Sequence, residues 1–320
     1  MRAVMRILFV IVAVLVAVPG WSGATRLETL DGVPVIDTTP VHGPRRVGRL
    51  TFLGGVRLKN PSSAFGGFSA IAAANGRIVL LGDGGNIVSF VLQGGQAQSV
   101  KFSALPAGPR TGWEKRDRDS ESMIRDPETG QLWVGFESAN AIWRYSADFS
   151  RTERAVRPPA MRRWSTNGGP EALARFSDGR FVAISETSRW RQAPGRAGIL
   201  FSSDPTLDPL RGFRFAYVPE VGFSPSDAAA LPNGDLLVLE RRFKLPFAFD
   251  ARLMLVKRGS IRPGGSVRGR LVAQLGAPFP SENYEAIAVT HEGRDTILWL
   301  ATDNDGSWWR PSLLMKFRLD

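Results

Sequence analysis

Carboxylates recur in this sequence at both ends of one short pattern. The segment GGPEALARFSDGRFVAISE (168–186) places Glu171 before a first apolar run and Glu186 after a second, with an Asp-Gly turn between the runs. Two apolar runs joined by such a turn predict a β-hairpin. Because the two strands of a hairpin are antiparallel, both carboxylates should emerge at the same, open end of it.

The same pattern occurs four times with an acid in the first position, and each copy also closes with an acid. The first acids are Glu121, Glu171, Asp227 and Glu285, and the closing acids are Glu137, Glu186, Glu240 and Asp303. A weaker copy, GFSAIAAANGRIVLLGD (67–83), has Ser69 near the first position and closes with Asp83. The copies begin about 50 to 58 positions apart.

A repeat of this length that consists of strands predicts a β-propeller, an all-β fold of four-stranded antiparallel blades. The first run of each copy mixes small with apolar residues, which suits an innermost strand where blades crowd together. The second run is nearly continuous in apolar residues and predicts a strand buried between neighbouring blades. Further strand-like runs complete the blades, at 142–147, 198–203, 213–220, 252–258 and 270–275.

Closure of the ring is predicted from the two ends of the repeat region. The segment VGRLTFLGGVRL (47–58) has no partner of its own, so we expect it to supply the outer strand of the last blade and remove a free sheet edge. Residues 25–46 form an N-terminal segment that is either a tail or part of a degenerate blade. The sequence therefore predicts a propeller domain over 47–320 with five or six blades.

A ring of such hairpins would gather the first acids around the mouth of the central channel. Clustered carboxylates raise one another's pKa unless a cation or arginines neutralise them, and Ca²⁺ takes six to eight oxygen ligands. We therefore expect catalytic roles for Glu121, Glu171, Asp227 and Glu285, and calcium binding by the same four residues with Asp303 and Asp305. The candidate substrate-binding residues are Arg189, Arg241 and Arg310. The alternative is that the acids cap turns or pair with nearby arginines.

Other kinds of catalytic site are poorly supported by the sequence. The segment DNDGS (303–307) resembles the start of an EF-hand loop but lacks the closing Glu, so only its oxygen donors remain candidates. The two histidines, His42 and His291, lie in the N-terminal segment and at a far-side turn, which disfavours a histidine triad or a zinc site. No nucleophile elbow, P-loop or dinucleotide fingerprint occurs.

The first 24 residues predict a secretory signal peptide. Two arginines precede an apolar run of twelve residues, and Ser22 and Ala24 stand at the small-residue positions of a cleavage site. Twelve residues are too few for a membrane span, which needs about 20. We therefore expect a periplasmic or secreted protein without a transmembrane span, and without disulfides because the chain has no cysteine.

The charge balance is basic. The net charge of +11 falls to +9 when Arg2 and Arg6 leave with the signal peptide. No run of five like charges is present, so we expect a small anionic or phosphoester substrate rather than specific nucleic-acid binding. We also expect a monomer.

The repeated motifs carry a family resemblance. The sequence resembles the phytase-like domain family, also described by esterase-like activity of phytase. The motifs span about residues 65 to 317 and are GGFSAIA, DSESMI with LWVGFE, GGPEALA with FVAISE, PSDAAAL with LLVLERRF, and NYEAIAV with LWLATDND. The resemblance implies an exported β-propeller with phosphoesterase activity and places Glu121, Glu171, Asp227 and Glu285 at the acidic positions. The first copy departs from the pattern, because Ser69 stands where the others have an acid.

Three functions follow from these observations. The first is a calcium-assisted phosphoesterase, in which the acids hold one or two Ca²⁺ ions and arginines offset developing charge. The second is a non-catalytic binding propeller for an envelope ligand or a protein partner, in which the acids are structural. The third is a calcium-dependent hydrolase of carboxylic esters or lactones, which differs from the first in substrate.

Overall fold

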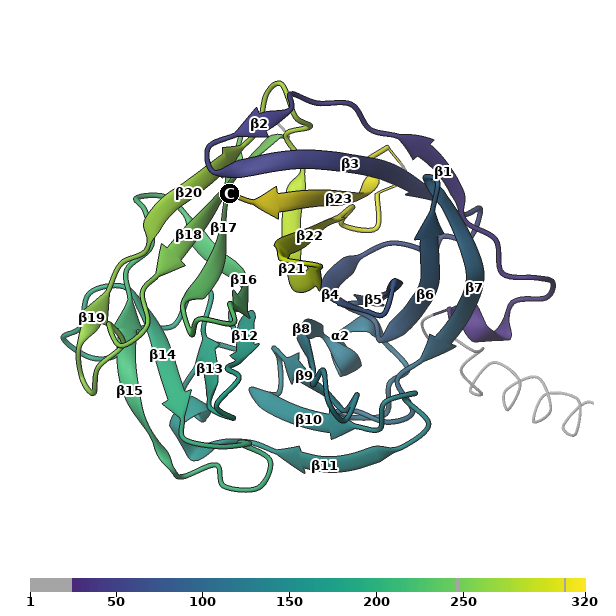
Figure 1. Ribbon diagram of the computed structural model, residues 1–320. Helices are drawn as coiled ribbons and strands as arrows, with labels where there is room; N and C mark the ends of the chain where they lie inside the picture. Colours follow the sequence, from purple (N-terminus) through teal and green to yellow (C-terminus); the bar gives the residue numbers. More distant parts are fainter. Residues whose placement is uncertain (1–24, 246–247, 308) are drawn as a thin grey trace, which may run out of the picture.

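The computed structural model describes residues 25–245, 248–307 and 309–320, and the predicted signal peptide lies outside this part of the chain. Five mostly antiparallel sheets form a ring around a central axis, with the first strand of each blade nearest the centre (Figure 1). The protein is thus an all-β propeller, as its sequence predicts, and it has five blades.

Each of the first four blades is formed by four or five strands that follow one another outward from the centre. The first two blades contain β4 (Phe68–Ala74), β5 (Arg77–Gly82), β6 (Asn86–Gln93) and β7 (Gln96–Ala104), then β8 (Ser120–Arg125), β9 (Leu132–Phe136), β10 (Ala141–Tyr145) and β11 (Thr152–Val156). The next two contain β12 (Ala172–Arg175), β13 (Phe181–Ile184), β14 (Arg196–Phe201), β15 (Gly212–Tyr217) and β19 (Ser266–Val267), then β16 (Ser224–Ala230), β17 (Leu236–Lys244), β18 (Ala248–Val256) and β20 (Arg270–Leu275).

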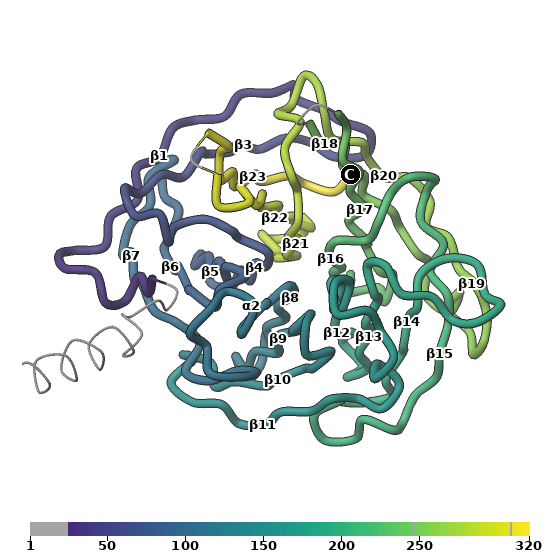
Figure 2. Tube along the Cα trace, turned by 180° about the vertical axis from the view of Figure 1, so that it is seen from behind, coloured from purple at the N-terminus to yellow at the C-terminus, as the bar shows by residue number. Residues whose placement is uncertain are grey.

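The fifth blade joins the two ends of the described chain. Its inner strands are β21 (Asn283–Glu292), β22 (Asp295–Asp303) and β23 (Ser312–Leu319), and its next strand is β3 (Leu50–Lys59), which pairs antiparallel with β23. The predicted outer strand of the last blade is therefore confirmed. The short strands β1 (Asp37–Pro40) and β2 (Arg46–Val47) also pair with β3. The N-terminal segment therefore adds outer strands to this blade and does not form a sixth blade (Figure 2).

The apolar core lies between the blades. All residues of β9 and of β13 are buried, which confirms that the second strands are covered on both faces. Trp133 and Ile142 of the second blade, for example, pack in one cluster with Leu173 and Ile199 of the third blade. Packing between flat faces fixes each blade relative to its neighbours, and so it fixes where the ends of the inner strands meet.

Helix is scarce in the described part of the chain. It consists of α2 (Lys115–Arg118) before β8 and the 3₁₀ turns η1 (Leu27–Thr29) and η2 (Pro159–Met161). Among the described residues, no helix combines the length and the apolar character that crossing a membrane requires.

Candidate functional site

Four of the five inner strands begin with a β-bulge. The pairing register between first and second strands skips one residue in each of them, and the skipped residues are Ser69, Glu121, Ser226 and Glu285. A bulge takes its residue out of the ladder and re-aims the side chain. Glu171 stands at the matching place in the third blade, directly before β12. The bulge thus turns two glutamates, Glu121 and Glu285, out of their sheets, and Glu171 reaches the matching place without one.

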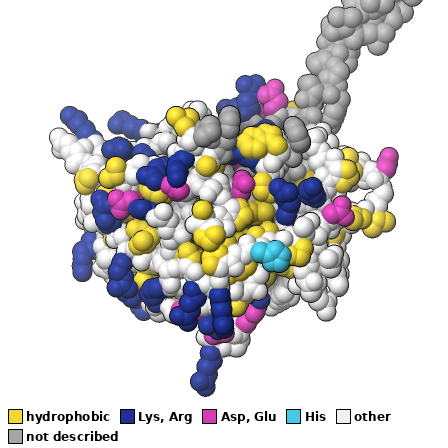
Figure 3. Space-filling model, turned by 90° about the horizontal axis from the view of Figure 1, so that it is seen from above, with side chains coloured by type: hydrophobic (Ala, Val, Ile, Leu, Met, Phe, Trp, Pro, Cys, Tyr) yellow, Lys and Arg dark blue, Asp and Glu magenta, His cyan; other side chains and the backbone are white. Residues whose placement is uncertain are grey.

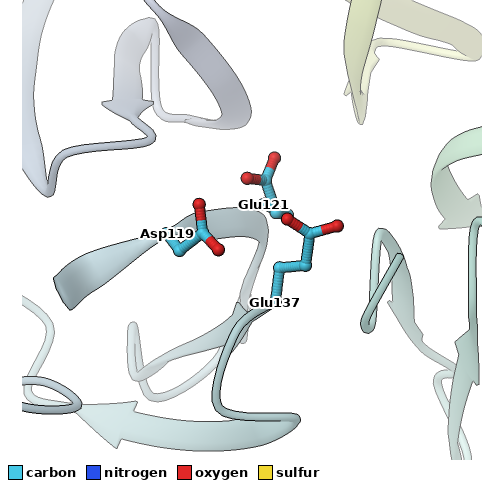
Figure 4. A group of neighbouring side chains, drawn as sticks. All are labelled: Asp119, Glu121 and Glu137. Carbon is cyan, nitrogen blue, oxygen red and sulfur yellow. The ribbon is translucent and has the colours of Figure 1, made fainter. Parts of the chain in front are cut away.

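Five carboxylates converge at this end of the second and third blades. Oxygens of Asp119, Glu121 and Glu137 lie within 4.8 Å of one another, and so do oxygens of Glu137, Glu171 and Glu186. Figure 4 shows the first three side chains gathered beside the start of β8, with Asp119 before that strand and Glu137 after β9. We call these five residues the carboxylate cluster. Glu137 belongs to both groups and is its common member.

Close approach of the chain at this point depends on Gly169. A Cβ added there would lie 2.6 Å from the Cα of Glu137, so only glycine lets the start of β12 pass beneath that residue. The GG pair ahead of Glu171 therefore has a packing reason. It brings acids from two blades within reach of each other.

The cluster disfavours its own ionisation. Burial raises the pKa of Glu121 well above its ordinary value, and the charges of Glu285 and Glu137 raise it further. Burial also raises the pKa of Glu171 well above its ordinary value, with added repulsion from Glu121 and Glu186. For Glu137, burial and the neighbouring Asp119 raise the pKa to about 7. Hydrogen bonds join the carboxyl group of Glu137 to those of Glu171 and Asp119.

Arg241 of β17 is the cation that meets these acids. Its Nη2 lies 3.3 Å from Oε1 of Glu186 and 3.1 Å from Oε1 of Glu285. Although burial lowers the pKa of Arg241, Glu285 and Glu186 raise it above its ordinary value, so the guanidinium stays charged. The structure therefore brings one of the three predicted substrate-binding arginines to the cluster.

A second acidic group adjoins the first at the junction of the fifth and first blades. Burial raises the pKa of Asp303 well above its ordinary value, and Glu285 and Asp83 raise it further. Lys115 pairs with Asp83, and both border a cavity of about 300 Å³ with Asp305. Arg310 pairs with Asp305 and lies 5.0 Å from the ring centre of Phe249. The predicted residues Asp303, Asp305 and Arg310 are thus beside Glu285 rather than within the five-residue cluster.

Asp227 is not brought to the carboxylate cluster. Its carboxylate accepts backbone hydrogen bonds from Ala228 at 2.7 Å, from Ile287 at 2.8 Å and from Leu173. Burial raises its pKa well above the ordinary value, and those backbone bonds lower it, with no charged group among the causes. Ser226, one residue earlier, occupies the bulge, and a one-residue step along a strand reverses the direction of the side chain. Asp227 therefore joins three inner strands.

Arg189 also lies apart from the acids. It is exposed in the loop between β13 and β14, where it borders a separate cavity with other arginines. No ion pair of Arg189 occurs in the described part of the chain. Among the described residues, no ion pair or side-chain hydrogen bond joins Arg189 directly to the cluster.

Three residues of the cluster were not predicted as site residues from the sequence, for two different reasons. Glu137 and Glu186 close their hairpins and are recognisable as a wider ring, although they were not proposed as ligands. Asp119 gives no such signal, because the matching position holds Gly67, Gly169, Ser224 and Asn283 in the other copies. Its position depends on the left-handed backbone that ends α2, with φ 44° and ψ 51°.

A comparison with known families identifies the chain. The family profile described as "Phytase-like: Esterase-like activity of phytase" matches residues 63–306. The chain belongs to the phytase-like family. The match covers all five residues of the carboxylate cluster and Arg241, and it confirms the resemblance seen in the repeated motifs.

Solved structures similar to this phytase-like protein are distant in sequence. Myxococcus xanthus glutaminyl cyclase is 13% identical with a TM-score of 0.49, over 86% of this chain and 99% of that one. The Malassezia sympodialis allergen Mala s 1 is 13% identical with a TM-score of 0.44, over 89% and 96%. Kuenenia stuttgartiensis hydrazine synthase is 13% identical with a TM-score of 0.37, over 73% of this chain and 64% of that one. No curated protein sequence matches the chain, and nothing about its activity follows from these similarities.

The carboxylate cluster of this phytase-like protein fits a hard divalent cation. All its donors are carboxylate oxygens, the ligand type that Ca²⁺ prefers. Within the part of the chain that the structure describes, Asp119, Glu121, Glu137 and Glu171 form no direct ion pair. The charge of Arg241 still acts on Glu171 and Glu121, and that of Lys115 acts on Glu121. A cation bound among these carboxylates would offset the repulsion that raises the pKa values of Glu121, Glu137 and Glu171.

Proposed function

We propose that this protein is an exported, calcium-dependent phosphoesterase whose active centre is the carboxylate cluster. The observation that carries the proposal is the convergence of acids on Glu137, where burial and neighbouring carboxylates raise the pKa values. Buried groups with perturbed pKa values are concentrated at functional sites. The family match supports hydrolysis of an ester bond.

The ligand set of the proposal differs in part from the one expected from sequence. Asp119, Glu121, Glu137, Glu171 and Glu186 would hold one or two calcium ions. Glu285, Asp303 and Asp305 would border the substrate instead of binding calcium. Glu285 pairs with Arg241, and Asp305 pairs with Arg310. Asp303 accepts a hydrogen bond from the backbone of its own loop. Asp227 is left out because backbone N–H groups occupy its carboxylate.

The side chains would then divide the chemistry between them. Bound calcium would supply Lewis acidity that polarises a phosphoryl oxygen and an attacking water molecule. Arg241 would donate hydrogen bonds to phosphoryl oxygens as their negative charge grows, because its guanidinium is fixed at the rim of the cluster. Glu121 or Glu171 would accept the proton of the water molecule at a carboxylate oxygen.

Export is part of the same proposal. The predicted signal peptide would carry the protein to the periplasm or the medium, where the calcium concentration suits carboxylate sites of moderate affinity. The absence of cysteine fits a fold stabilised by packing alone, whatever the redox state of that compartment.

A substrate panel tests the proposal. Purified protein is assayed against phosphomonoesters, phosphodiesters, carboxylic esters and lactones, in parallel with calcium and with a calcium chelator. We expect calcium-dependent hydrolysis of a phosphoester. Hydrolysis of carboxylic esters alone would favour the third function, for which the word "esterase-like" in the family description is the specific support. Calcium binding without turnover of any ester would favour a binding propeller and overturn the proposal.

A further inference from the structure

A cavity of about 500 Å³ lies beside the loop that follows Glu186, and basic and aromatic side chains border it. Two indoles, Trp164 and Trp190, form part of its wall. The basic residues that border it are Arg162, Arg163, Arg189, Arg191 and Arg214. We call this cavity the arginine pocket. No acidic side chain borders it.

Three separate segments supply these arginines. Arg162 and Arg163 follow η2 in the connection between the second and third blades, and Arg189 and Arg191 lie in the loop between β13 and β14. Arg214 belongs to β15. The positive charge at this cavity therefore depends on how the chain folds, because no single basic run of the sequence supplies it.

The positive charges of the arginine pocket have no internal counter-ions. In the described part of the chain, none of its five arginines takes part in an ion pair or a side-chain hydrogen bond, whereas Arg144 and Arg175 nearby pair with acids at 2.7 Å and 3.0 Å. The guanidinium of Arg214 lies 4.6 Å from the ring centre of Trp190. Lys and Arg side chains are also spread over the side of the molecule in Figure 3, but acidic ones lie among them there.

The aromatic wall contains a buried donor without a partner. Trp190 is fixed, because its Nε1 donates to the carbonyl oxygen of Phe215 at 2.7 Å. Trp164 is only 5% exposed, and its Nε1 forms no hydrogen bond in the structure. A buried polar group without a partner costs free energy, so Trp164 is held here by its packing.

A second cavity adjoins the arginine pocket and has Ser138, the residue after Glu137, at its border. This space of about 420 Å³ shares Arg162 and Trp164 with the pocket and is also bordered by Ser138 and Asn140. The backbone N–H of Ser138 donates to Oδ2 of Asp119 at 3.1 Å. One residue at the border of the second cavity thus contacts the cluster, although no member of the cluster borders either cavity.

We propose that the arginine pocket is a second binding site, which takes a small ligand carrying two or more phosphate groups. Guanidinium groups bind phosphate oxygens in a bidentate manner, and several of them around one cavity match several phosphates rather than one. A volume of about 500 Å³ is within the range of small-molecule pockets. The proposal goes beyond the hydrolytic function and holds whether or not the cluster binds calcium.

Calorimetric titration of the purified protein with inorganic triphosphate tests the proposal, in 150 mM salt and with a calcium chelator present. We expect saturable binding, which the double variant Arg189→Gln/Arg191→Gln weakens about tenfold or more, because two guanidinium contacts are lost. Both residues are exposed, so the variant should fold, which its thermal midpoint verifies. The variant Arg189→Lys/Arg191→Lys keeps the positive charge but loses the planar guanidinium groups that bind phosphate through two N–H groups at once. It should recover only part of the affinity.

Two controls make the result specific. The variant Arg262→Gln/Arg294→Gln makes the same change of charge at exposed arginines outside the pocket and should leave affinity unchanged. Glu137→Gln should also leave it unchanged. The proposal is overturned if the wild-type protein does not bind triphosphate, or if the control arginine variant weakens binding as much as the pocket variant. It is equally overturned if Glu137→Gln abolishes binding, since the anion would then lie at the cluster.

Discussion

Glu137 directly follows β9 of the second blade, Glu171 directly precedes β12 of the third blade, and their carboxyl groups are hydrogen-bonded to each other. Two carboxyl groups can share such a bond only when one of them keeps its proton. Burial and Asp119 also raise the pKa of Glu137 to about 7. A cation that bound between the two groups would therefore have to displace a proton near neutral pH.

Glu137→Gln should weaken calcium binding most among single changes, because Glu137 contributes to both groups of acids. We expect a loss of affinity of about tenfold or more, since calcium affinity follows the number of charged ligands. Calorimetric titration with calcium measures it. Glu292→Gln makes the same change at an exposed residue that pairs with Lys316 at 2.7 Å, and it should bind like the wild type. Equal affinities of Glu137→Gln and wild type would remove Glu137 from the site.

Stability of the calcium-free protein should fall as the pH rises from 5 to 8. The pKa of Glu137 is about 7 in the folded protein against an ordinary value of 4.5, so the folded state binds its proton more tightly than the unfolded state. The resulting stability is complete below pH 4.5 and is lost as the pH passes through about 7. Burial raises the pKa values of Glu121 and Glu171 as well, which acts in the same direction.

Thermal midpoints across this pH range, with chelator and with calcium, measure the effect. Calcium should raise the midpoint more at pH 8 than at pH 5, because protons compete with it at the lower pH. Two results would contradict raised pKa values for these acids in the folded protein. One is a midpoint that rises steadily with pH in chelator, and the other is a calcium effect that is larger at pH 5.

Arg241→Gln should lower kcat by about 10² to 10³, the usual effect of losing one donor to a developing oxyanion. Calcium affinity should not fall, because the change removes a positive charge beside Glu186 and Glu285. The matched control is Arg242→Gln on the same strand, since Arg242 pairs with Asp250 at 2.6 Å instead. If the two variants have the same kcat, Arg241 has no role in the reaction.

Asp227→Asn should reduce stability without changing calcium affinity. The amide nitrogen of Asn cannot accept a hydrogen bond, so one of the backbone N–H groups bound by the carboxylate loses its acceptor in the interior. We expect the free energy of unfolding to fall by about 1 to 3 kcal/mol. Urea unfolding measures this, with the exposed Asp295→Asn as the control. A large loss of calcium affinity in Asp227→Asn would instead return Asp227 to the ligand set.

Most of the fold follows from the sequence because a propeller repeats one local pattern. Two apolar runs and a turn predict each hairpin, and residues 47–58 are recognisable as a strand without a partner in the sequence. The number of blades did not follow, since VPVID in the N-terminal segment has the same apolar character as a blade strand. Pairing of β1 with β3, which depends on contacts between distant segments, decides it.

The site was only partly predictable, and the register explains the difference. Glu121, Glu171 and Arg241 were found because the repeat places them at one end of the hairpins. Asp227 was assigned by the same repeated pattern, but the bulge falls on Ser226, and the sequence SPSDAAA does not show which residue is bulged. Asp119 depends on a turn that occurs in one blade alone, so no repeat could reveal it.

The rate of phosphoester hydrolysis as a function of free calcium, measured for the wild type and for Glu137→Gln, brings the cluster, the metal and the chemistry into one experiment. We predict no hydrolysis in chelator, saturable recovery as calcium is returned, and a curve displaced to about tenfold higher calcium or more for Glu137→Gln. Hydrolysis that is the same with and without calcium, or the same curve for both proteins, would contradict a calcium-dependent active centre at Glu137.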